Sequence, residues 1–120
     1  MKQLMVTVIG VGLAGIVVSA QAGDPAAGKT AFAERHCGTC HKTDKDDAKG
    51  GKMSTVLADK VGSMSPAQIK AWLTDPAALE AKLPKKPPVL MSAYLKNQKP
   101  PLSETEVTNL VAYLKSLAPK

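Results

Sequence analysis

The chain has 120 residues, a formal net charge of +6, two cysteines and few aromatic residues. A domain of this size can bury only a modest apolar core, and small domains often complete it with a metal, a disulfide or a cofactor. A basic surface suits nucleic acid, anionic lipid or an acidic protein as a partner, but no aromatic residues alternate with the lysines as base stacking would require. An acidic protein is therefore favoured over nucleic acid.

Residues 1–22 have the pattern of a secretory signal peptide. A positive start at Lys2 precedes an apolar run over residues 4–18, and Ala20-Gln21-Ala22 matches the small-x-small cleavage pattern. The run is shorter than the roughly 20 residues of a membrane-spanning helix. We therefore favour cleavage after Ala22 over an uncleaved anchor. We expect an exported, periplasmic protein with a signal peptide over 1–22, one domain over 23–120, and no membrane span in the mature chain.

The first half of this domain predicts helices and no alternating strand pattern. Asp24 is a good N-cap and Pro25 suits the first helical position, so a helix is predicted from there to about Arg35. A polar, solvated loop is expected over 42–52, and a short helix near 54–60.

The second half has clearer signals for the starts of helices. Ser65 and Gln68 form a capping box, and Pro76 lies where that helix is expected to end. The stretch 83–101 contains five prolines and cannot be one regular element. A second capping box over 103–106 opens the last helix, whose apolar face consists of Val107, Leu110, Val111, Leu114 and Leu117.

The motif that carries the chemistry is Cys37-Gly38-Thr39-Cys40-His41, because C-x-x-C-H is the haem-attachment signature. Its two thiols have the spacing to reach the two vinyl groups of one porphyrin, and the next residue offers an imidazole to the iron. A disulfide oxidoreductase is expected to show a βαβ context, which is not visible here. A zinc site needs two further ligands, and His36 is the only other histidine. A structural disulfide across so short a loop would be strained.

From end to end, residues 23–120 resemble the class I c-type cytochromes. The resemblance rests on the motif at 37–41, on the closing segment Leu110-Val111-Ala112-Tyr113-Leu114, and on Gly28 and Phe32 in the first helix. It implies an all-α cytochrome c fold of three to five helices around one covalent haem c, with the first and last helices crossing. Helical-bundle cytochromes carry the motif near the C-terminus, so they are excluded.

The resemblance also implies roles for individual residues. Cys37 and Cys40 become the haem thioethers, and His41 becomes the proximal iron ligand. Trp72 is a candidate contact for a haem propionate, although a tryptophan on an apolar helix face is equally often core. Many relatives have a proline after the motif whose carbonyl orients the histidine, whereas the stretch 52–57 has none. The hydrogen-bond partner of His41 is therefore left open.

Class I cytochromes usually close the iron with a methionine from a loop before the last helix. Met91 is the favoured residue, because Met91-Ser92-Ala93-Tyr94 resembles the ligand loop of the family and lies in the proline-rich stretch. Met64 and Met53 are the alternatives, and His36 is too close to the motif to reach the opposite haem face.

With both axial positions occupied no substrate site is left, so the expected function is one-electron transfer between redox proteins, not catalysis. The alternative is a haem-bearing subunit of a periplasmic oxidoreductase complex. We expect a monomer that meets an acidic redox protein, as donor or acceptor, at a basic surface. The lysines of that surface are Lys82, Lys85, Lys86, Lys96 and Lys99.

Overall fold

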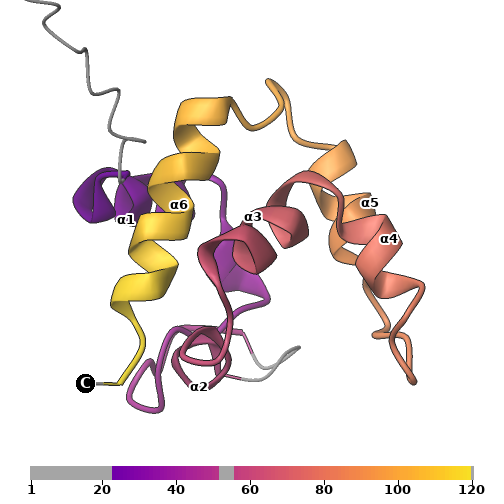
Figure 1. The fold of residues 1–120 in the computed structure, drawn as a ribbon, viewed down its shortest axis with the longest axis horizontal. Helices are drawn as coiled ribbons and strands as arrows, with labels where there is room; N and C mark the ends of the chain where they lie inside the picture. The colour runs from indigo at the N-terminus through magenta and orange to yellow at the C-terminus, as the bar shows by residue number, and fades with distance from the viewer. Residues whose placement is uncertain (1–22, 52–55, 120) are drawn as a thin grey trace, which may run out of the picture.

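A computed structural model describes residues 23–51 and 56–119 of the chain (Figure 1). This part contains helices and no β-strand. Its elements are α1 (Pro25–Glu34), the 3₁₀ helix η1 (Cys37–Thr39), α2 (Leu57–Val61), α3 (Pro66–Thr74), α4 (Pro76–Glu80), α5 (Met91–Lys96) and α6 (Glu104–Ser116). None of these described helices has the length and apolar character needed to cross a membrane.

The three helix starts expected from capping residues are confirmed. Asp24 accepts a hydrogen bond from the first turn of α1. Ser65 and Gln68 close a complete capping box at α3, and Ser103 and Glu106 close another at α6. These side chains satisfy backbone N–H groups that a helix leaves without partners at its N-terminus.

The segment after α3 differs from the expectation. Pro76 was expected near the end of a helix, and it also begins α4, a separate helix of 5 residues. The break falls at Asp75, whose backbone is not helical (φ −143°, ψ 63°), because a proline cannot continue the preceding helix. With α4 the described residues hold six α-helices, one more than the three to five expected. The short helix expected at 54–60 begins at Leu57, and residues 52–55 lie outside the described part.

The first and last helices cross in close contact, as predicted (Figure 1). Gly28 lies at the crossing, where a Cβ atom would overlap the backbone oxygen of Asn109. One turn later the rings of Phe32 and Tyr113 meet edge to face, with their centroids 5.6 Å apart. The glycine therefore lets the two backbones approach, and the aromatic pair fills the space beside them.

The core lies around α6 and is built mainly from α3 and α6, with one buried residue each from α1 and α2. Its buried members are Ala31, Val61, Ile69, Leu73, Val107, Leu110, Tyr113 and Leu114. Leu110 is the most deeply buried of these, with 1% of its surface exposed. Helix α5 contributes no fully buried residue. In Figure 1, α3 separates α6 from the pair α4 and α5.

Candidate functional site

The C-x-x-C-H motif forms one tight turn directly after α1. His36 adopts a left-handed backbone (φ 55°), which ends the helical path and begins η1. The N–H groups of Cys40 and His41 both point back to the carbonyl oxygen of Cys37, at 3.3 and 3.0 Å. The structure therefore brings the two thiols and the imidazole onto a single turn.

Both thiols on this turn are half-buried and neither belongs to a disulfide. Burial raises the pKa of the Cys37 thiol to about 11, although the nearby charge of Arg35 acts in the opposite direction. The thiol therefore stays protonated at neutral pH. Disulfide oxidoreductases use a thiolate whose pKa is lowered, so Cys37 has the opposite property from the nucleophile of such an enzyme.

The His41 side chain is half-buried, and burial lowers its pKa. The imidazole is therefore neutral at pH 7, which is the form that ligates a metal. The stretch expected to orient it falls mostly on residues 52–55, and Met53 falls there too. Both expectations therefore concern residues outside the described part of the chain.

The loop after the motif folds back against it. The Asp47 carboxylate accepts hydrogen bonds from the N–H and the hydroxyl of Thr43, both at 3.1 Å. The Gly51 N–H donates to the Gly38 carbonyl oxygen at 2.8 Å, and a Cβ at Gly51 would overlap the backbone of Thr39. This loop, expected to be merely solvated, therefore holds the motif from one side.

Met91 is the first residue of α5, where a loop position was expected. Its side chain is half-buried and packs against the core, and the same is true of Met64. Three residues on, Tyr94 donates a hydrogen bond from its hydroxyl to the Arg35 carbonyl oxygen at 2.6 Å. This bond ties the helix of Met91 to Arg35, which lies in the segment that leads into the motif.

Two further interactions fix this arrangement, and sequence reasoning missed both. Arg35 binds Glu106 of α6 through two hydrogen bonds of 2.8 and 2.6 Å, and also the Pro100 carbonyl oxygen. Glu80 accepts hydrogen bonds from the Ser92 N–H and hydroxyl at 2.8 and 2.6 Å. The bond from the Ser92 hydroxyl, chiefly, holds the pKa of Glu80 below its ordinary value, so the carboxylate is ionised.

Comparison with known proteins agrees with this geometry. The family model described as Cytochrome c matches residues 25–118. The chain belongs to the cytochrome c family. No curated protein and no solved structure matches it. The all-α fold, the contact between the terminal helices and the paired cysteines next to α1 all fit this family.

The donor set fits the covalent haem of a cytochrome c. Cys37 and Cys40 are unpaired thiols on one turn, and His41 offers a neutral imidazole from the adjoining residue. Elsewhere in the described residues, no three or more His, Cys, Asp or Glu side chains are grouped so as to hold a metal ion. Apolar side chains that are only half-buried against the core, among them Phe32 and Leu57, are available to contact a porphyrin.

Trp72 lies on α3 and is half-buried. Within the described residues it is not among the side chains packed against the core cluster, unlike its neighbours Ile69 and Leu73. Its indole therefore does not pack against the core cluster. Contact with a haem propionate remains a prediction for this cytochrome.

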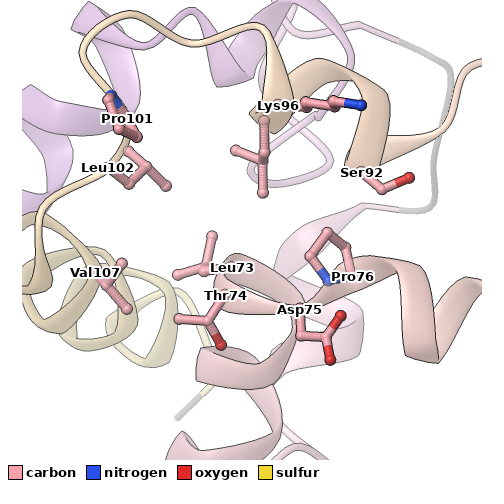
Figure 2. A pocket seen from close by; sticks show the side chains of 10 residues that line it. Leu73, Thr74, Asp75, Pro76, Ser92, Lys96, Pro101, Leu102 and Val107 are labelled. Atoms are coloured by element: carbon pink, nitrogen blue, oxygen red, sulfur yellow. The ribbon is translucent and has the colours of Figure 1, made fainter.

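A cavity of about 390 Å³ lies beside α5 (Figure 2). Leu73, Leu102 and Val107 form part of its wall, and Ser92 and Lys96 of α5 line it from the other side. Neither the motif residues nor Met91 belong to this lining. The cavity therefore borders the helix that carries Met91, and it is distinct from the turn that carries the thiols.

Proposed function

We propose that residues 23–120 form a periplasmic monohaem c-type cytochrome that carries one electron at a time between redox proteins. A cytochrome c domain implies haem-based electron transfer. The observation that carries the proposal is the turn of two unpaired thiols and a neutral imidazole at the end of α1. Export is supported by the signal pattern of residues 1–22, for which we propose cleavage after Ala22. It also suits the motif, because haem-bearing cysteines of this kind are joined to haem outside the cytoplasm.

In this proposal Cys37 and Cys40 hold the cofactor through thioether bonds and His41 supplies one axial ligand. Addition of each thiol S–H across a haem vinyl group would give these bonds with no leaving group, and the protonated thiol of Cys37 would suit that addition. When bound, haem supplies an iron centre that gains and loses one electron.

Met91 is proposed as the second axial ligand. Its position at the start of α5 and the link from Tyr94 to Arg35 support this choice over Met64. A methionine thioether raises the reduction potential relative to a second histidine. With both axial positions taken, no residue set for substrate chemistry is left, so the proposed role is that of a carrier and not of an enzyme.

The proposed docking surface for an acidic donor or acceptor is basic and exposed. All five lysines of this surface are exposed in the structure: Lys82, Lys85, Lys86, Lys96 and Lys99. The large exposed apolar side chains Leu83 and Val89 lie in the same stretch of chain, with 37% and 49% of their surface exposed. Exposed positive charge favours fast, orienting association with an acidic partner. We expect the protein itself to be a monomer.

A redox titration with a matched pair of variants tests this function. The purified protein should follow a one-electron Nernst curve, and its ferric form should show the charge-transfer band of a sulfur ligand. Met91→Ala should remove that band and lower the potential, whereas Met64→Ala should preserve both. Loss of the band in Met64→Ala instead would overturn the ligand assignment. A native extract in which the protein elutes with a larger partner would favour the alternative, a subunit of an oxidoreductase complex.

A further inference from the structure

The first turn of α5 has no capping residue of its own. The helix is six residues long, and its N-cap position is Leu90, which makes no side-chain hydrogen bond. The first backbone N–H groups of a helix need partners from outside it. In α5 these groups belong to Met91 and Ser92, so the same turn carries the proposed iron ligand.

Glu80 at the end of α4 supplies these partners. One carboxylate oxygen accepts from the Ser92 N–H at 2.8 Å and the other from the Ser92 hydroxyl at 2.6 Å. The backbone of Met91 also contributes to lowering the pKa of this carboxylate. Twelve residues separate Glu80 from Ser92 in the chain, so this cap comes from a different helix.

The burial of Glu80 is unusual for a charged side chain. Only 5% of its surface is exposed, and it is the one buried charged side chain among the described residues. Burying a carboxylate is costly unless it is fully hydrogen-bonded. The two donors of Ser92 bind one carboxylate oxygen each, and they hold the start of α5 against the end of α4.

We propose that Glu80 is a positioning residue for Met91: its buried carboxylate holds the first turn of α5 so that the thioether is kept at the iron. The inference rests on the proposed function, because it takes Met91 as the axial ligand. Glu80 does not touch the cofactor in this account. It acts by reducing the fraction of molecules in which the methionine has left the iron.

External imidazole measures that fraction directly, since it binds ferric iron only when the methionine has left. Glu80→Ala should raise the apparent imidazole affinity by about tenfold, since donors that were hydrogen-bonded lose a charged acceptor. Glu80→Gln keeps one acceptor oxygen and should restore most of the wild-type value. Glu104→Ala removes an exposed acid from the first turn of α6, so it serves as the matched control and should bind imidazole as wild type does.

The outcomes distinguish a failure of the role of Glu80 from a failure of the proposed function. If Met91→Ala binds imidazole no better than wild type, the ligand assignment and the proposed function fail together. If Met91→Ala binds it much better but Glu80→Ala does not, the role of Glu80 alone is overturned. Should Glu80→Ala fail to fold, Ser92→Ala, which removes one donor, carries the test. An affinity equal to wild type in that variant would contradict the inference.

Discussion

The two ends of the proposed iron site are held in different ways. The motif follows α1, which crosses α6 in close contact at Gly28 and the Phe32–Tyr113 ring pair. Met91 begins α5, which contributes no fully buried residue and is connected to its surroundings by polar contacts from Glu80 and Tyr94. The histidine end is therefore held by the close crossing of two helices together with the Arg35–Glu106 pair. The methionine end depends mainly on hydrogen bonds, with only half-buried apolar contacts beside them.

This difference indicates where the molecule opens first. Regions with few buried apolar contacts open locally at a lower free energy than the core does. We therefore expect the segment over 76–101 to open without loss of the α1–α6 crossing. Changes at the crossing should lower global stability, and changes around α5 should alter ligation and partner binding with little effect on global unfolding.

The largest effect on global stability should come from truncating the core. Leu110→Ala should lower the free energy of unfolding by about 2–5 kcal/mol, because it removes a fully buried side chain and leaves a cavity. Leu83→Ala, in the proline-rich segment, removes the same atoms from an exposed position and should cost less than about 0.5 kcal/mol. Denaturant unfolding of both variants measures the contrast. Equal costs would show that the two regions do not differ as described.

A somewhat smaller loss is expected at the helix crossing. Gly28→Val should destabilise the protein by about 1–3 kcal/mol, because the new side chain meets the backbone of α6. Gly62→Ala is the matched control, since a Cβ there has its nearest neighbours at 3.9 Å and the backbone φ is −60°. That substitution should be neutral or stabilise by up to about 1 kcal/mol. Thermal melts that rank the two variants the other way would contradict the close crossing.

The ion pair that joins α1 to α6 predicts a pH dependence. Hydrogen bonding to Arg35 holds the pKa of Glu106 below its ordinary value. The stability it provides is therefore present above the ordinary glutamate pKa of about 4.3 and is lost as the pH falls through and below that value. Glu106→Gln should be less stable than wild type at pH 7, and the two should converge as the pH is lowered toward 3. A difference in stability between the two proteins that stays constant with pH would show that the ion pair does not stabilise the fold.

Changes to the basic surface should affect stability least, because they act on the rate of association with the partner. Electron transfer to the native partner should slow as the Debye length falls from about 30 Å at 0.01 M salt to about 8 Å at 0.15 M. Charge reversal at Lys85 and Lys86 together should slow it more than reversal at Lys45 and Lys49, which are also exposed. A second-order rate independent of salt, or equal effects from the two pairs, would reduce these lysines to a solvated surface.

The features that the sequence predicted are those encoded locally. The caps Ser65 and Ser103 depend on residues three positions away, and the crossing at Gly28 was expected from a family resemblance in short segments. The contacts around α5 could not be found in this way. Glu80 is 12 residues from Ser92, and Tyr94 is 59 residues from Arg35. No periodicity or capping rule connects such pairs, so only the folded chain brings them together.

The central claim is that Cys37 and Cys40 hold one haem by covalent bonds, and intact-mass measurement tests it most directly. After acid–acetone extraction, the mature protein should retain the mass of residues 23–120 plus one haem. The double variant Cys37→Ala, Cys40→Ala should lose the haem and fail to fold stably, because the cofactor completes a small core. A wild-type protein that releases its haem on extraction and leaves two titratable thiols would contradict the account.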